Sequence, residues 1–237
     1  MEIKPIAYFR SPFPGKFGVP RQAGLAPAVK GRIVFEPEFR NPDAIRGLED
    51  FDYIWLIWEF NGNHLSPDAS SGGSSQAWKP TVRPPRLGGN ARVGVFASRS
   101  PFRPNPLGLS SVRLESIDYE AKDSDGRPIG PVINVLGADL MDGTPIYDIK
   151  PYVEYADSHP GARSGFVDTT AWEPLQVEFP VGAEETIPDL DTLREVLSLD
   201  PRPSYQDDPS REYGMSFEGR EVRFKVSGRL LTVISIK

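Results

Sequence analysis

The sequence predicts a mainly β protein in which a single β-barrel is followed by a small α+β domain. Short runs rich in Ile, Val, Tyr and Phe are bounded by Gly, Pro and Asn, which is typical of strands and turns. The chain carries 22 Gly and 25 Pro, so we expect shaped loops and no long helices. Strands and helices do not alternate regularly, so a barrel or a sandwich is favoured over a parallel α/β sheet.

Several strands are expected before the C-terminal domain. They span residues 3–9, 32–35, 53–60, 92–97, 111–119 and 132–136. One short helix is expected at 41–47, between Asn41, which can cap it, and Gly47, which can end it. Residues 65–76 are rich in Ser and Gly and predict a flexible surface loop.

Turn-forming residues after the last dense motif mark the end of the barrel. We expect a barrel domain at 1–158, a linker at 159–178 and an α+β domain at 179–237. In the last of these, Asp189 can cap a helix, and strands are expected at 220–226 and 230–236. The apolar residues on one face of that helix are Leu190, Leu193, Val196 and Leu197.

Composition excludes several kinds of site. Cysteine is absent, which rules out disulfides and thiolate ligands and fits a cytoplasmic protein. His64 and His159 lie outside any metal-ligand spacing, so no metal is predicted. P-loop, GxGxxG and GxSxG motifs are missing. No apolar run approaches the length that spans a bilayer, and the first residues, MEIKPIAYFR, do not resemble a signal peptide, so we expect no membrane partner.

Charge is distributed unevenly along the chain. The net charge of −6 argues at first against a polyanionic partner. Residues 69–114, however, contain seven cations and no acid. One part of the molecule can therefore attract phosphates while the remainder is acidic.

A proline-stiffened segment, RSPFRPNPLGLS at 99–110, follows the predicted strand 92–97. Its prolines fix the backbone and remove ladder hydrogen bonds, so Arg99, Arg103 and Asn105 would project from a rigid loop. Arginine pairs bidentately with carboxylates and phosphates. A stiff turn with its arginines in solvent explains the pattern about equally well.

A second segment, 139–152, places three aspartates, a lysine and two tyrosines around an Asp-Gly turn. Asp148, Lys150 and Tyr152 share one side if the segment is extended. Such a face can orient a polar ligand, and its carboxylates can accept a proton. From the residues alone, a hairpin with a surface Asp–Lys pair is the better interpretation.

Two further loops combine cations with rigid or permissive residues. FGVPRQ at 17–22 follows the first strand and ends in an arginine and an amide. RPPRLGGN at 83–90 carries Arg83 and Arg86 beside prolines and glycines, which suits a phosphate-contacting edge and a solvated basic loop equally.

The four segments, in their order along the chain, closely resemble the corresponding motifs of the TrmO family. RGLEDFDYIWLIWEF at 46–60 and DPRPSY at 200–205 share this resemblance. Its members are tRNA (adenine-N6)-methyltransferases acting on N6-threonylcarbamoyladenosine beside the anticodon. The resemblance implies a single-barrel domain that binds S-adenosylmethionine (SAM) without a Rossmann-like sheet. It also implies a homodimer whose substrate is the anticodon stem-loop of tRNA.

The resemblance further implies which loops hold the cofactor. The implied contacts are Pro20, Arg21, Gln22, Asn61, Gly62, Arg99, Leu109, Asp139, Leu140, Met141, Asp142 and Gly143. Family members often carry histidine where this chain has Asn61, which is a departure from the family pattern.

The implied chemistry assigns roles to other residues. A sulfonium methyl group is already electrophilic, so positioning and water exclusion are the main requirements. The urea-like acceptor nitrogen is a poor nucleophile, so a proton acceptor would help, and Asp142 and Asp148 are the candidates. The threonyl carboxylate would suit one of Arg99, Arg103 or Lys150, and the stem phosphates would suit basic side chains. The residues expected on the RNA side are Arg83, Arg86, Arg92, Arg103, Asn105, Lys150 and Tyr152.

Two alternatives stay open at this point. A barrel that binds RNA without catalysis would use the basic stretch on phosphates and Phe102 or Tyr152 to stack bases. The same barrel and cofactor could also serve a different methyl acceptor.

Overall fold

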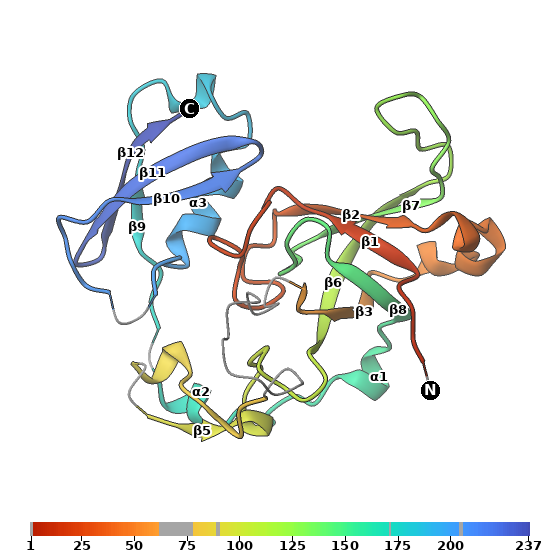
Figure 1. The fold of residues 1–237 in the computed structure, drawn as a ribbon, viewed down its shortest axis with the longest axis horizontal. Helices are drawn as coiled ribbons and strands as arrows, with labels where there is room; N and C mark the ends of the chain where they lie inside the picture. Colours follow the sequence, from red (N-terminus) through yellow and green to blue (C-terminus); the bar gives the residue numbers. More distant parts are fainter. Residues whose placement is uncertain (1, 62–77, 89–90, 171, 204–205) are drawn as a thin grey trace, which may run out of the picture.

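Six strands in the N-terminal part of the chain form a closed barrel (Figure 1). The computed structural model describes residues 2–61, 78–88, 91–170, 172–203 and 206–237. The strand order is β1-β2-β7-β6-β3-β8, all neighbours are antiparallel, and β1 pairs with β8 to complete the circle. The bounds are β1 Ala7–Arg10, β2 Lys30–Phe35, β3 Tyr53–Glu59, β6 Leu107–Asp118, β7 Val132–Leu136 and β8 Pro145–Pro151. The predicted barrel is confirmed.

Inward side chains of these strands form the barrel core. Burial along β3 alternates because successive strand residues point to opposite faces. Ile33, Ile54 and Ile146 are wholly buried at 0% exposure. The packing leaves no room at Gly31, where an added β-carbon would lie 2.1 Å from the Phe9 ring. Position 31 therefore requires glycine.

The strand predicted at 92–97 is confirmed only at Val93–Gly94, and it does not belong to the barrel. The chain forms only a short strand there, β5 (Val93–Gly94), which pairs with β4 (Thr81–Val82) outside the barrel and continues into a 3-10 turn, η6 (Val95–Ala97). Val95 is buried but Phe96 is 71% exposed, so the apolar run has no continuous buried side. The sixth strand of the barrel is β8 instead. Its terminal prolines and its charged residues are uncommon in strands.

The helix predicted at 41–47 is a 3-10 helix, η2 (Pro42–Ile45), which lies between η1 (Pro37–Phe39) and η3 (Leu48–Asp50). The Asn41 side chain accepts a hydrogen bond from Asp43 N at 3.0 Å, and Gly47 has φ of 84°. The predicted cap and stop are confirmed, and the segment between them is too short for an α-helix. The loop predicted at 65–76 lies outside the described residues.

The C-terminal domain packs a helix on a small sheet of order β10-β11-β12-β9. Its elements are β9 Gln176–Glu178, η7 Ala183–Glu185, α3 Leu190–Ser198, β10 Tyr213–Phe217, β11 Arg220–Ser227 and β12 Leu230–Ile236. The predicted cap of α3 is confirmed, because Asp189 accepts from Thr192 N at 3.1 Å. The segment predicted as a linker carries α2 (Phe166–Thr169) after α1 (Glu154–Asp157), and it ends in β9.

The loop between β1 and β2 joins the two domains. Phe13, Ala26 and Val29 of this loop are buried in one apolar cluster with residues of α3 and the C-terminal sheet. Backbone contacts add to the packing: Glu218 N donates to Pro12 O at 3.1 Å. Figure 1 shows the loop, in red, between the barrel and the C-terminal domain. Across the described ranges, no helix is long and apolar enough to cross a membrane.

Candidate functional site

The barrel register gathers the implied cofactor loops at one end. The ends of β1, β3 and β7 and the starts of β2, β6 and β8 meet there, as the pairs Lys30↔Leu136, Glu59↔Leu107 and Tyr8↔Pro145 define. Loops 11–29, 98–106 and 137–144 and residue Asn61 therefore converge on this loop end of the barrel. Segments distant in sequence become neighbours because antiparallel strands return to the same end.

A hydrogen-bonded chain leads from the barrel core to Asp139. Trp58 Nε1 donates to Ser110 Oγ at 2.9 Å, and Ser110 Oγ donates to Asp139 Oδ1 at 2.6 Å. Trp58 reaches this position because Gly108 lies under its indole, where a β-carbon would be 2.3 Å from the ring. The carboxylate thus accepts at the loop end from a buried Ser110 hydroxyl, which Trp58 orients by donating to its oxygen.

Burial is the main influence on the Asp139 carboxylate, and it raises the pKa above the usual aspartate value. Hydrogen bonds from Ser110 and from backbone amides act in the opposite direction, as does the charge of Arg99. A carboxylate whose ionised form is disfavoured by desolvation attracts cationic or N–H-bearing ligands strongly, because water competes weakly there.

Asn61 joins the end of β3 to the loop before β8. Its Nδ2 donates to Gly143 O at 3.2 Å, and Thr144 Oγ1 donates to Met141 O at 2.8 Å. The amide therefore shapes the 139–143 loop, the part that the resemblance assigns to the cofactor. Gly62, implied as a further contact, lies outside the described residues.

Gln22 and Arg99 connect two of the implied loops directly. The Arg99 guanidinium donates to Gln22 Oε1, and Arg99 is otherwise exposed. Leu109, in the same region, is 58% exposed, so it offers an apolar surface at the loop end. Leu140, in contrast, is 1% exposed, and its side chain belongs to the barrel core.

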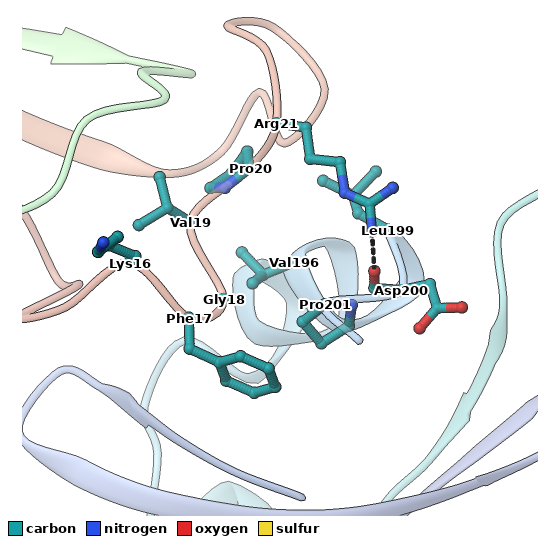
Figure 2. Close-up of a pocket in the computed structure, with 10 residues that line it drawn as sticks. All are labelled: Lys16, Phe17, Gly18, Val19, Pro20, Arg21, Val196, Leu199, Asp200 and Pro201. Atoms are coloured by element: carbon teal, nitrogen blue, oxygen red, sulfur yellow. Dashed lines mark hydrogen bonds between the residues drawn. The ribbon is translucent and has the colours of Figure 1, made fainter. Parts of the chain in front are cut away.

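Arg21 points away from this cluster and toward the C-terminal domain. Its Nη2 donates to Asp200 O at 3.1 Å and to Arg202 O at 3.0 Å. Figure 2 shows the side chain extending over a cavity of about 270 Å³ to the turn at Asp200. Desolvation lowers the pKa of Arg21, which the charge of Asp200 partly offsets. The residues lining the cavity are Lys16, Phe17, Gly18, Val19, Pro20, Arg21, Val196, Leu199, Asp200 and Pro201.

The turn that receives Arg21 is itself fixed by an ion pair. Arg202 is 8% exposed and donates to both Asp200 oxygens at 2.9 Å. This pair raises the pKa of Arg202. Asp200 has φ of 53°, a left-handed conformation that aspartate tolerates better than most residues. The DPRP sequence at 200–203 therefore forms a rigid turn whose carbonyl groups accept hydrogen bonds from Arg21.

The two candidate proton acceptors lie in different places. Asp142 is at the loop end, where Oδ1 accepts from Ser11 N at 3.1 Å and Oδ2 lies 3.5 Å from Arg10 Nη1. Asp148 lies in the middle of β8, pairs with Lys150 at 3.1 Å and lines a cavity with η1, η2 and η3 toward the opposite end. The register brings only Asp142 close to the implied cofactor loops.

The candidate RNA-binding residues also separate into groups. Arg83, Arg86 and Asn105 are exposed, and Arg92 donates to Thr81 Oγ1 at 3.0 Å. Arg103 donates to Val95 O and Ser98 O at 3.2 and 2.8 Å, so its guanidinium braces the loop. Lys150 and Tyr152 follow Asp148 toward the opposite end, where the Tyr152 ring packs 5.9 Å from that of Trp55.

Sequence reasoning missed three residues of this arrangement: Trp58, Ser110 and Arg202. A signal existed for Ser110, because it occupies an inward position of β6 between buried Gly108 and Val112, and a polar residue at such a position requires a partner. Arg202 lies in the DPRPSY segment that carries the family resemblance, but nothing in the sequence indicated its ion pair with Asp200. Among the described residues, no three His, Asp or Glu side chains come close enough to hold a metal ion.

Fold and site together define a closed antiparallel barrel with a polar loop cluster at one end and an α+β domain packed behind it. Residues 8–158 match the family described as "tRNA-methyltransferase O N-terminal domain", and residues 173–237 match "TrmO C-terminal domain". The chain belongs to the TrmO family.

Individual relatives agree with this assignment. The chain is 38% identical over 247 residues to the tRNA (adenine(37)-N6)-methyltransferase of Escherichia coli K12, covering 100% of this chain and 97% of that protein. It is 40% identical over 225 residues to a Pseudomonas aeruginosa protein provisionally named S-adenosylmethionine-dependent methyltransferase RcsF, with coverage of 90% and 87%. The crystal structure of TrmO from P. aeruginosa superposes with a TM-score of 0.73 at 31% identity, covering 100% and 98%.

Proposed function

We propose that the chain is a SAM-dependent methyltransferase that methylates N6 of adenosine in tRNA, and that its acceptor is N6-threonylcarbamoyladenosine beside the anticodon. The observation that carries the proposal is the gathering of the family's loops at one end of the barrel, around Asp139 and Asn61. The names of the E. coli and P. aeruginosa relatives support both the reaction and the cofactor. The family resemblance supports the finer choice of acceptor and a homodimeric assembly.

The side chains at the loop end fit SAM chemically. The cofactor supplies an electrophilic methyl group on a positively charged sulfur. Asp139 offers a desolvated carboxylate to a cation or an N–H donor. Asn61 offers an amide, and Leu109 offers exposed apolar surface, so polar and apolar parts of one ligand can both be bound.

Transfer itself forms an N–C bond, breaks an S–C bond and releases the proton of the acceptor nitrogen. The chain's task is to align the nitrogen, exclude water and receive that proton. Oδ2 of Asp142 is the proton acceptor in this proposal, because Oδ1 accepts from Ser11 N at 3.1 Å while Oδ2 has only the longer 3.5 Å contact with Arg10 Nη1. Arg99 binds the threonyl carboxylate, since Arg103 braces its own loop and Lys150 lies toward the opposite end.

The decisive experiment is single-turnover transfer of labelled methyl from SAM to one tRNA transcript, with and without enzymatically installed threonylcarbamoyladenosine. We expect transfer to the modified transcript alone. Transfer to neither transcript, with SAM still raising the melting temperature by mass action, would move the search to another acceptor. No transfer and no stabilisation would leave a non-catalytic RNA binder.

Arg21 offers a test of whether the C-terminal domain supports the cofactor loop. We expect Arg21→Ala to lower the unfolding free energy by about 1 kcal/mol through two lost hydrogen bonds and to weaken SAM binding several-fold by loosening loop 17–22. Thermal unfolding and SAM titration measure the two effects. Arg127→Ala, an exposed arginine paired with Asp125, is the matched control. Weaker SAM binding at unchanged stability would instead mean that Arg21 contacts the cofactor.

A further inference from the structure

Exposed aromatic side chains gather beside the β4–β5 hairpin, in the residues just before β4, in η6 and in the loop after η6. Phe96 is 71% exposed, Trp78 is 46% exposed and Phe102 is 40% exposed. The rings of Trp78 and Phe96 stack, with centroids 6.3 Å apart and planes inclined by 23°. Apolar side chains clustered in solvent, where burial would be favourable, are typical of binding surfaces. We call these three residues the aromatic patch.

Cations flank the rings and hold them in place. Lys79 Nζ lies 5.2 Å from the Phe102 centroid, and Arg103 Cζ lies 5.7 Å from the Phe96 centroid. Because Arg103 also donates to the Val95 and Ser98 carbonyls, it fixes the η6 turn that presents Phe96. A ring presented rigidly loses little conformational entropy when a partner stacks on it.

The charge around the patch selects the kind of partner. Residues 78–114 contain seven cations and no acid, so the surroundings attract a polyanion. A second copy of the chain fits less well, because a two-fold contact through this surface would bring like charges together. Flat apolar rings among cations suit a strand that carries both phosphates and unstacked bases.

We propose that the aromatic patch binds unpaired bases of the RNA substrate by stacking, with Lys79 contacting the adjoining phosphates. The identification of the partner as RNA rests on the proposed function. The patch is also well placed for it, because Phe102 follows Arg99 in the loop that reaches Gln22 at the loop end. Bases next to the methyl acceptor would therefore meet the aromatic rings.

Binding of a labelled anticodon stem-loop to the full chain, without SAM, tests the proposal. Phe96→Ala and Trp78→Ala should each weaken binding roughly 5- to 100-fold, as loss of one stacked base does. A fully paired RNA of equal length should bind the two alanine variants as tightly as it binds the unaltered chain. Phe96→Trp, which keeps an aromatic ring, should bind the stem-loop with the affinity of the unaltered chain. Tyr119→Ala is the matched control, because Tyr119 is 43% exposed on the β6–β7 loop, well away from β5 in Figure 1.

Salt dependence separates stacking from charge. Phe96→Ala should shift the plot of log affinity against log salt without changing its slope. Lys79→Gln should reduce the slope by about 0.7, the value for one phosphate contact on a single strand. A changed slope in Phe96→Ala would mean that the ring only positions cations and would overturn the stacking role.

Other outcomes would also overturn the proposal. These are unchanged stem-loop affinity in both alanine variants, equal losses on stem-loop and paired RNA, or a lower sedimentation mass with RNA affinity intact, which would make the patch a subunit interface. Because binding is measured without methyl transfer, a failure of the proposed reaction would leave the result interpretable. If the alanine variants bind the stem-loop more weakly but no methyl transfer is found, the chain binds RNA and catalyses a different reaction or none.

Discussion

Asp139→Asn is expected to weaken SAM binding by about 10- to 100-fold, which corresponds to loss of a hydrogen bond to a charged group, roughly 1.5–3 kcal/mol. The substitution keeps the shape and an oxygen that can accept from Ser110, but it removes the negative charge. Equilibrium titration with SAM measures the change. Asp118→Asn changes an exposed aspartate at the end of β6 opposite to Ser110; it is the control and should bind SAM normally.

The same variant should not lose stability at neutral pH. Burial raises the pKa of Asp139 in the folded state, so the folded chain holds this proton more tightly than the unfolded chain does. The contribution of Asp139 to the unfolding free energy therefore falls as pH rises above about 3.9, the value for unfolded aspartate. Asp139→Asn has no such titration, so the unfolding free energy of the variant should rise relative to that of the unaltered protein between acidic and neutral pH. A variant that is most destabilised at neutral pH would contradict the assignment.

Burial disfavours the ionised form of Asp139, yet Ser110 donates to it and is itself oriented by Trp58, an arrangement better explained by ligand binding than by folding. The adjoining Gly108 supports this view, because any larger residue there would displace Trp58. Packing in the barrel core and orientation of Asp139 are therefore coupled through one short chain of contacts.

The barrel and the C-terminal helix could be predicted because they depend on patterning. Alternation along β3 and the apolar face of α3 follow directly from strand and helix periodicity. The segment of β8 was predicted only as part of an Asp-Gly hairpin and not as a barrel strand, because Asp148 and Lys150 are polar and prolines stand at both ends. The strand predicted at 92–97 corresponds to β5 of the β4–β5 hairpin outside the barrel, because hydrophobic composition alone does not reveal which sheet a strand joins.

The candidate site divides in the same way. Motif order identified the loops that the register brings together, although no spacing in the sequence places Asn61 beside Gly143. The direction of Arg21 could not be predicted, since it depends on carbonyl groups of Asp200 and Arg202 about 180 positions later. Backbone acceptors leave no trace in residue identity, so contacts of this kind emerge only from the fold.

Asp142→Asn is expected to slow the single-turnover methylation rate by about 100-fold or more, the usual contribution of a positioned proton acceptor. Asparagine can still accept from Ser11 N, so the loop should remain in place, and stabilisation by SAM should persist. A slow methyl-transfer step with SAM binding intact is the combination that a purely structural role would not produce. Asp148→Asn tests the other candidate within the same segment, and it should change the rate less than about threefold because Asp148 faces Lys150 and the η1–η3 cavity. If Asp148→Asn slowed methylation more than Asp142→Asn, Asp148 would be the proton acceptor. The methyl-accepting base would then have to approach from the opposite end of the barrel.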